Sequence, residues 1–266
     1  MTPTWDATDL DSGTSDGVVH ESTPDTSYDN ASEIRKGDVT GAPLFASDLE
    51  AWYPLQGTSG PAKDFSGNNN DGTVSGAQPA GGTSLCGTNT YSFDGTNDYI
   101  EIPDSTDFDL ASGFTFGCWF YNLFDDSIDW EGLISRHNGS FRSAGYSLTI
   151  RDIGVSGHQP MLYLNDSRYE SVQISEKEWT FVAFAYDGTD INWVVDEDTG
   201  THTNVVTPGT PNNDIYIGTN TWNVTTDLYK GSLADARVYN RALSKSEMED
   251  WRDVFRAPST HTAVKK

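Results

Sequence analysis

The sequence predicts an all-β protein, built as a sandwich or barrel of short antiparallel strands. From residue 49 onward, short runs rich in aromatic and β-branched residues alternate with segments of Gly, Asn, Asp and Pro, which is the spacing typical of such folds. A chain of 266 residues can bury one good core, and all-β domains often reach this length without dividing. The runs are, in order, LEAWYPL, YSFDG, DYIEI, FTFGCWFYN, GLISRH, YSLTI, MLYLN, WTFVAFAYDG, INWVVD, IYIG and SLADARVYN.

The runs FTFGCWFYN and WTFVAFAYDG alternate with a period of two residues, so each presents one set of side chains to the same face of a strand. We expect these faces, and most aromatic residues, to lie in the core. The residues that share a face are Phe114, Phe116, Cys118 and Phe120 in the first run, and Trp179, Phe181, Ala183 and Ala185 in the second.

One helix is predicted, near the C-terminal end. Ser244 and Glu247 have the spacing of a capping box, and Met248 and Trp251 follow at helical spacing. Pro258 cannot continue a helix, so the helix is expected to end before it.

Residues 1–46 differ in composition from the rest of the chain. They are acidic and of low complexity, with few apolar side chains, so they cannot form a core of their own. We predict an extended N-terminal arm here, followed by one domain over residues 47–258 and a C-terminal tail over 259–266. Two interpretations of the arm stay open: a solvated tail, or a segment that orders on a partner or a neighbouring subunit.

The charge is strongly negative, with 40 acidic and 16 basic residues and a formal net charge of −24. Such a surface repels itself unless counter-ions screen it, and the Debye length falls to about 3 Å near 1 M salt. An Asp-rich, Lys-poor chain therefore indicates a high-salt environment; an extracellular setting rich in divalent cations is the alternative. Nucleic acid is not expected as a partner, because no Lys/Arg cluster is present to neutralise phosphates.

Neither a membrane-spanning segment nor a recognisable export signal is expected from the sequence. No run of 18 apolar residues occurs, and the first residues lack the basic and apolar regions of a signal peptide. Cys86 and Cys118 allow at most one disulfide, and we expect free thiols because Cys118 lies within an apolar run.

Six segments, in order, resemble the laminin-G-like branch of the concanavalin A-like jelly rolls. They are LEAWYPLQG, DFSGNNNDGTVSGA, YSFDGTNDYIEIP, FTFGCWF, EWTFVAFAYDG and YKGSLADARVYNRALSKSEM, and the resemblance covers residues 47–256. It implies a two-sheet antiparallel jelly-roll sandwich in which the first and last strands pair. It also implies a carbohydrate-binding or adhesion module, sometimes with bound calcium.

The stretch DFSGNNNDG, residues 64–72, is a candidate site for calcium or another hard cation. Asp64, Asn69 and Asp71 offer the oxygen ligands that calcium prefers, although their spacing is not that of an EF-hand. The resemblance implies a further acidic ligand from the last strand, where this chain reads GSLADAR and retains only Asp235. The side-chain pattern hints at a bulge that would aim Asp235 toward the loop. The alternative is an ion-free turn, since Asn and Asp adopt left-handed turns without an ion.

Candidate glycan-binding residues are aromatic side chains flanked by polar ones, because a sugar ring offers an apolar face and a rim of hydroxyls. Burial of each aromatic against a neighbouring strand is the alternative interpretation. The aromatic candidates are Trp130, Trp222, Tyr163 and Tyr169, and Asn165 is the candidate polar partner beside the two tyrosines.

No enzyme is predicted. The Glu-x-Asp-x-x-Glu pattern of glucanases with this fold does not occur, nor do the nucleophile-elbow or zinc-protease motifs. Asp129 and Glu131 come nearest to a carboxylate pair, and they would share a face only within a strand.

The function expected from these features is non-catalytic surface attachment or decoration by a lectin-like jelly roll. We expect a virion component of a halophilic system, displayed as a turret, spike or fibre, with a virion-surface or extracellular location. Its expected partners are cell-surface glycans or glycoproteins and, through the N-terminal arm, neighbouring virion or self subunits in a homo-oligomer. A free or secreted carbohydrate-binding module and a purely structural decoration protein are the alternatives.

Overall fold

The computed structural model describes residues 48–110, 112–123, 130–138, 144–153, 157–221 and 224–255. The predicted arm over residues 1–46 and the tail over 259–266 lie outside these ranges. Within them the chain forms two seven-stranded antiparallel sheets, which we call sheet I and sheet II. The expected two-sheet jelly-roll sandwich with one short C-terminal helix is confirmed.

Sheet I holds the first and last strands of the fold side by side. Its order is β1 (Leu49–Tyr53), β14 (Lys230–Tyr239), β5 (Phe114–Asn122), β10 (Trp179–Tyr186), β11 (Ile191–Val195) and β12 (Asp198–His202), with β3 (Tyr91–Asp94) also paired to β14. The pairing of β1 with β14 is the one that the family resemblance implied.

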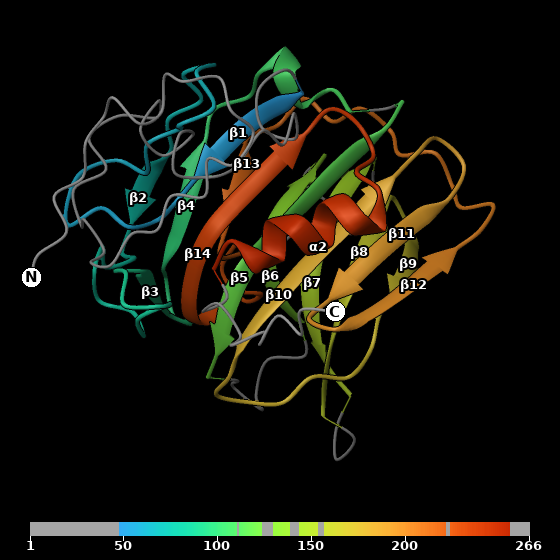
Figure 1. Cartoon of the computed structure of the whole chain (residues 1–266). Helices are drawn as coiled ribbons and strands as arrows, with labels where there is room; N and C mark the ends of the chain where they lie inside the picture. Colours follow the sequence, from blue (N-terminus) through green and yellow to red (C-terminus); the bar gives the residue numbers. More distant parts are fainter. Residues whose placement is uncertain are drawn as a thin grey trace, which may run out of the picture.

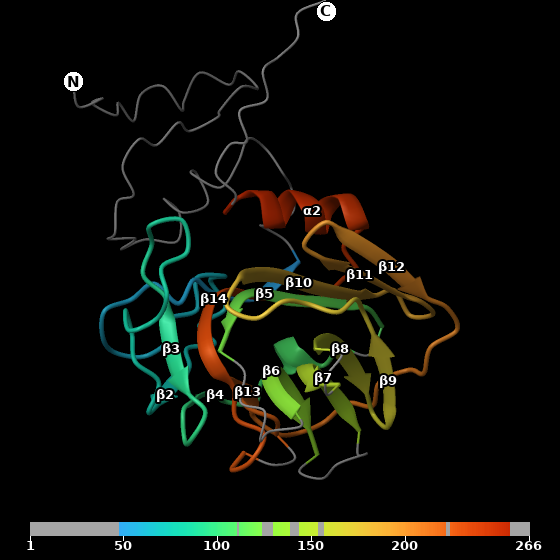
Figure 2. The ribbon, with the colours of Figure 1, turned by 90° about the horizontal axis from the view of Figure 1, so that it is seen from below.

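Sheet II forms the second layer. Its order is β2 (Thr73–Ser75), β4 (Tyr99–Ile102), β13 (Ile215–Ile217), β6 (Trp130–His137), β7 (Gly145–Asp152), β8 (His158–Leu164) and β9 (Ser167–Glu170). A short 3-10 helix, η3 (Thr106–Phe108), lies between β4 and β5. Figure 2 shows the two layers, with β5 and β10 in one and β6 and β7 in the other.

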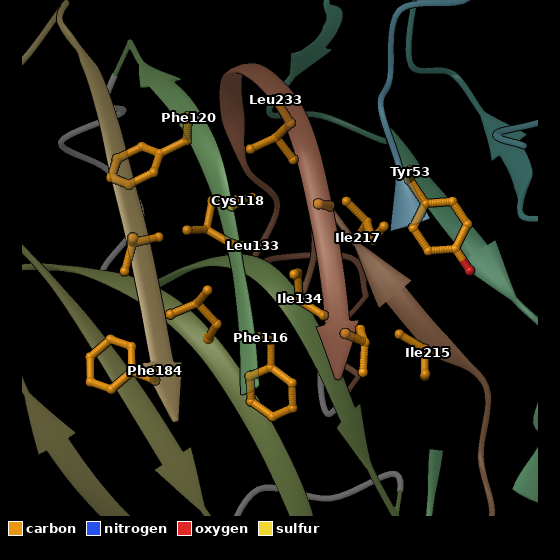
Figure 3. Packing of buried hydrophobic residues seen from close by; sticks show 14 of the residues in the cluster. Tyr53, Phe116, Cys118, Phe120, Leu133, Ile134, Phe184, Ile215, Ile217 and Leu233 are labelled. Carbon is orange, nitrogen blue, oxygen red and sulfur yellow. The ribbon is translucent and has the colours of Figure 1, made fainter. Parts of the chain in front are cut away.

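The main core lies between the sheets. The alternating residues predicted for the first run point inward, and Phe116, Cys118 and Phe120 pack with Ile134 and Phe184 (Figure 3). Cys118 is buried, Cys86 is exposed, and neither thiol forms a disulfide. Removing this apolar surface from water is the main favourable contribution to folding, at about 25 cal/mol per Å².

A second, smaller core lies on the outer face of sheet I, beneath helix α2 (Lys245–Asp253) (Figures 1 and 2). The predicted capping box is present, with Ser244 and Glu247 bonded in both directions, and Met248 and Trp251 are the buried apolar residues of the helix. Trp251 packs edge-to-face on Phe181, with ring centroids 5.1 Å apart. The alternate side chains of β10 thus face α2, because successive residues of a strand point to opposite faces.

Asp235 is the polar centre of this second core. It sits at the predicted bulge of β14, with a φ of 51° and a register shift between Ala234 and Arg237. Its fully buried carboxylate accepts hydrogen bonds from the indole nitrogens of Trp52 (2.7 Å) and Trp251 (2.6 Å) and from Nε of Arg237 (2.9 Å). The Arg237 guanidinium lies over both indole rings, 4.6 Å from Trp52 and 5.2 Å from Trp251.

No helix within the described ranges is long and apolar enough to cross a membrane.

Replacement of Glu247 by Gln is expected to lower stability at neutral pH and to have little effect in acid. The Arg241 guanidinium, 2.9 Å from the Glu247 carboxylate, holds the pKa of that carboxyl below its ordinary value of 4.5. Because the pKa of this carboxyl is lower in the folded than in the unfolded protein, its ionised form stabilises the fold at any pH above its pKa in the unfolded protein. This stability is lost as the pH falls through its pKa in the folded protein. Gln keeps the capping box but not the charge. Because the pair is partly exposed and screened, we expect about 0.5 to 1 kcal/mol at neutral pH.

Urea unfolding of the parent and of Glu247→Gln across the range from neutral to acid pH measures this difference. Glu249→Gln, on the same helix, is the matched control and should change stability by less than about 0.5 kcal/mol at any pH. A difference for Glu247→Gln that stays constant into acid would contradict the ion-pair explanation.

Candidate functional site

The outer face of sheet II carries polar and aromatic side chains where β6, β7 and β8 lie side by side. On β7, Tyr146, Leu148 and Ile150 point into the core. The residues that alternate with them, including Thr149 and Arg151, therefore belong to the opposite face. Registers of β6 with β7 and of β7 with β8 bring side chains of all three strands together there.

Trp130 and Tyr163, both predicted as glycan-binding residues, meet on this face. Their rings contact edge-to-face, with centroids 5.6 Å apart and planes at 75°. Trp130 is half-buried, whereas Tyr163 is only 4% exposed. Tyr163 therefore supports Trp130 more than it presents a surface of its own, and Trp130 supplies the accessible apolar surface of the pair.

Three charged side chains surround the aromatic pair. The Arg151 guanidinium lies 4.9 Å from the centroid of the Trp130 ring. Glu170 lies 3.1 Å from Nε of Arg168 and 4.0 Å from Nη1 of Arg151. Burial raises the pKa of the Tyr163 hydroxyl, and the nearby Arg168 and Arg151 oppose that rise. We call Trp130, Tyr163, Arg151, Arg168 and Glu170 the outer patch.

The backbone of residues 219–221 crosses the same face beside the outer patch. A Cβ on Gly132 would lie 2.3 Å from the carbonyl carbon of Thr219, so only glycine allows this close approach. The Ser135 hydroxyl donates to the carbonyl of Thr219 (2.9 Å) and accepts from the amide of Thr221 (2.8 Å). Hydroxyls of β7 add to this network, because Ser147 and Thr149 both donate to Oδ1 of Asn220, at 2.6 and 3.2 Å.

The other predicted glycan-binding residues do not join the outer patch. Asn165 has a φ of 53° in the β8–β9 turn, and its amide bonds to Gly145, Gly209 and Thr207. The Tyr169 ring packs against the core and His202, and its hydroxyl accepts from the amide of Val206. These contacts hold the turn and the 205–209 segment in place. Trp222 lies outside the described residues.

Asp64 organises the loop that was predicted as a cation site. Its carboxylate accepts hydrogen bonds from the amides of Trp52 (2.9 Å), Ser66 (2.8 Å) and Asn70 (3.0 Å) and from the Ser66 hydroxyl (2.8 Å). Asn70 in turn accepts from the Tyr53 hydroxyl through its carbonyl, at 2.5 Å. The carboxylate thus ties the loop to β1 through hydrogen bonds.

The remaining residues of the predicted cation site are dispersed around the loop. Asn69 is exposed, with a φ of 65°. Asp71 forms an ion pair with Lys63 (2.5 Å) and accepts from the amide of Asp64 (3.0 Å). Asp235 instead faces the indoles of Trp52 and Trp251 on the helix side of sheet I.

Within the described ranges, no group of three or more His, Cys, Asp or Glu side chains is arranged to hold a metal ion. Calcium binding by the loop stays a prediction.

Arg151, Arg168 and Glu170 were not predicted as site residues from the sequence. A signal for Arg151 was present, since in YSLTIR the polar residues Ser147, Thr149 and Arg151 alternate with apolar ones, as expected for a strand with one solvent-facing side. Arg168 and Glu170 follow the β8–β9 turn at the same period of two. What the sequence could not supply was the register that places them opposite Tyr163 and Met161 of β8.

Glu131, considered above as half of a carboxylate pair, is turned away from the outer patch. It lies opposite Ile150 of β7 and is buried, near enough to Tyr229 to raise the pKa of that hydroxyl after burial itself. Asp129 lies outside the described residues.

The chain is similar to proteins of one structural superfamily. Residues 94–249 match the family described as the concanavalin A-like lectin/glucanases superfamily, in its laminin G form. No curated protein sequence matches the chain.

Solved structures with the same fold include both binding domains and enzymes. Domain 4 of an extracellular arabinanase from Geobacillus stearothermophilus, in complex with arabinotriose, is 20% identical with a TM-score of 0.55 and covers 79% of this chain and 100% of its own. The binding domain of Paraclostridial mosquitocidal protein 1 is 16% identical with a TM-score of 0.57, covering 76% of this chain and 51% of that one. Trypanosoma rangeli sialidase in complex with sialic acid is 14% identical with a TM-score of 0.60, covering 81% of this chain and 34% of that one.

At these identities the likeness to solved structures concerns the fold. The family match covers more than half of the sequence and agrees with the two stacked antiparallel sheets. The chain belongs to the concanavalin A-like lectin/glucanases superfamily.

Proposed function

We propose that this protein is a non-catalytic glycan-binding module whose ligand rests on the outer patch of sheet II. The observation that supports this best is the contact of Trp130 with Tyr163, flanked by Arg151, Arg168 and Glu170. An aromatic surface beside hydrogen-bonding groups suits a sugar, because the ring carbons pack on the aromatic face while the hydroxyls bond to the polar rim.

The rigidity of the patch favours binding. Trp130 is held by Tyr163 on one side and by Arg151 on the other, so little side-chain freedom remains to be lost when a ligand binds. Rigid strands also position side chains better than loops do.

The proposal of a non-catalytic role rests on the carboxylates around the patch. Glycoside hydrolysis commonly uses two carboxylates that flank the bond to be broken. Here Glu170 is engaged by two arginines, and Glu131 lies on the opposite face of β6. The two carboxylates therefore do not flank one position on the patch, which supports a binding role.

We further propose that the module serves in surface attachment or decoration, as a turret, spike or fibre of a virion in a halophilic system. The support is compositional: a net charge of −24 suits high salt, and residues 1–46 have the composition of an arm that orders on neighbouring subunits. A carbohydrate-binding module of a secreted protein is the second candidate. This candidate is favoured because the alignment with the domain of an extracellular arabinanase covers 100% of that domain.

Replacement of Trp130 by Ala is expected to weaken glycan binding strongly while leaving the fold intact. Loss of this ring removes the apolar surface on which the sugar packs, so binding should weaken about tenfold or more. A glycan array probed with the full chain, in about 1 M salt to screen self-repulsion, provides the measurement.

Trp179→Ala is the matched control for Trp130→Ala. Trp179 is also half-buried, but it lies on β10 of sheet I, where its indole donates to the carbonyl of Ser84. This variant should keep glycan binding. Equal loss in both variants would show a general effect on folding, and an array without any bound glycan for the parent would favour the purely structural decoration protein.

A further inference from the structure

Within the described ranges, the arginines of this acidic chain are, with two exceptions, matched by carboxylates of their own. Arg136 pairs with Asp104 and Asp109, Arg241 with Asp48 and Glu247, Arg252 with Glu197 and Asp253, and Arg237 with Asp235. Most of these pairs join neighbouring segments of the fold. The surplus of acid in the sequence makes such matching easy, so an arginine without it is informative.

Arg151 and Arg168 are the exceptions among the described arginines. Both contact Glu170, which is the one carboxylate within the described ranges that pairs with either of them. The two guanidiniums are partly exposed, at 31% for Arg151 and 47% for Arg168. The outer patch therefore carries a surplus of one positive charge, on a protein whose net charge is −24.

We infer that the outer patch selects anionic saccharides, in which a carboxylate or sulfate group of the sugar contacts Arg151 and Arg168. This inference rests on the proposed glycan-binding function and names the class of its ligand. Guanidinium groups bind carboxylate and sulfate-type oxyanions through two parallel N–H donors, which gives both strength and orientation. The sugar ring of the same ligand would pack on Trp130, which Arg151 already contacts.

The salt concentration determines how strongly this acidic protein repels an anionic ligand. At low salt, the net charge of −24 repels any anion from the whole surface. Near 1 M salt the Debye length is about 3 Å, so that long-range repulsion disappears while direct contact with a guanidinium persists in part. A high-salt environment is therefore compatible with an anionic ligand on an acidic protein.

The test compares ligands that share a sugar chain and differ in the presence of an anionic group. Isothermal titration calorimetry measures the affinity of the full chain for oligogalacturonate and for its neutral methyl ester. The ester lacks the carboxylate charge and keeps the sugar chain. Sulfated lactose and lactose provide the same comparison for sulfate, and the two pairs together distinguish the two anions. We expect at least one anionic ligand to bind about tenfold or more tightly than its neutral partner.

Three variants locate the effect. Arg151→Gln and Arg168→Gln should each weaken binding of the anionic ligand about tenfold, which is a larger loss than the same variant causes for the neutral ligand. Glu170→Gln removes the competing carboxylate, so it should strengthen anionic binding. An increase cannot result from misfolding. Lys245→Gln, which removes one positive charge at the start of α2 on the outer face of sheet I, is the matched control and should have no effect.

The outcomes separate the inference from the function it rests on. Equal affinity for charged and neutral partners, lost in Trp130→Ala, would overturn the anionic inference and leave the glycan-binding function in place. Weaker anionic binding in Glu170→Gln, or an equal effect of Lys245→Gln and Arg151→Gln, would also overturn it. Absence of binding to any saccharide would overturn both.

Discussion

Replacement of Asp235 by Asn is expected to lower the free energy of unfolding by about 3 to 5 kcal/mol, the usual cost of breaking a buried ion pair. Asp235 and Arg237 are both fully buried, with Nε of Arg237 2.9 Å from the carboxylate. Asn has the same size and tolerates the φ of 51° at this position, so neither a cavity nor backbone strain accompanies the change. The measured loss would therefore report the charge and the hydrogen bonds of the carboxylate rather than packing or strain.

The two indoles make this loss larger than that of the ion pair alone. Trp52 and Trp251 both donate to the carboxylate, and an Asn side chain can offer its oxygen to only one of them, while its NH₂ group would face the other donor. A buried donor without an acceptor costs about 1 to 3 kcal/mol. Because Trp251 belongs to α2 and Trp52 to β1, docking of the helix on sheet I should weaken as well.

Equilibrium unfolding in urea at fixed salt, followed by tryptophan fluorescence, measures the change. Asp71→Asn is the matched control, since the ion pair of Asp71 with Lys63 is exposed and should be worth less than about 1 kcal/mol. Raising the salt should reduce the loss of unfolding free energy caused by Asp71→Asn and leave the loss caused by Asp235→Asn nearly constant. Similar losses for the two variants would contradict the assignment of Asp235 as the polar centre of the second core.

The fold could be predicted because its determinants are local and repeated. The two-residue period of FTFGCWFYN and WTFVAFAY predicts which side chains enter the core, and the capping box predicts the helix start, since both depend on residues close in sequence. The bulge at Asp235 could also be predicted, from the spacing of apolar residues in β14. The direction of the Asp235 side chain could not, because it depends on Trp52, which is 183 residues away.

The candidate site was only partly predictable, for the same reason. Trp130 and Tyr163 stood out as aromatics among polar neighbours, but their contact arises from the order β6-β7-β8 within sheet II. Asn165 has the same polar surroundings in the sequence, yet its left-handed turn conformation directs its amide to the backbone of other loops. Composition reports which groups are polar, whereas register decides which of them meet.

Replacement of Gly132 by Ala is expected to displace residues 219–221 and to cost about 1 to 3 kcal/mol or more through overpacking. The added methyl group would lie 2.3 Å from the Thr219 carbonyl carbon and 2.5 Å from the Asn220 amide nitrogen. These atoms are backbone, so they cannot turn aside as the end of a flexible side chain can. Either the 219–221 segment or β6 has to move.

Hydrogen exchange identifies which of the two moves. The Thr221 amide donates to the Ser135 hydroxyl over 2.8 Å, so movement of the segment should expose this amide and speed its exchange, while amides of β6 paired with β7 keep their protection. Ser135→Ala, which removes the acceptor without adding volume, should speed exchange at Thr221 with a smaller loss of stability. Gly57→Ala is the control, because a Cβ there meets only the Tyr91 hydroxyl, at 3.3 Å, and Ser59 beyond it.

The same substitution tests whether the segment shapes the ligand site. Gly132 is two residues from Trp130 on β6, and the two share the outer face of sheet II through their pairing with Thr149 and Arg151. If residues 219–221 form a wall of the outer patch, Gly132→Ala should weaken glycan binding even where the variant is fully folded. Ser135→Ala removes a hydrogen bond to residues 219–221 without displacing them, so it should weaken glycan binding less than Gly132→Ala does. Unchanged binding in a variant whose Thr221 amide exchanges freely would confine the ligand to the side of the patch formed by β8 and β9.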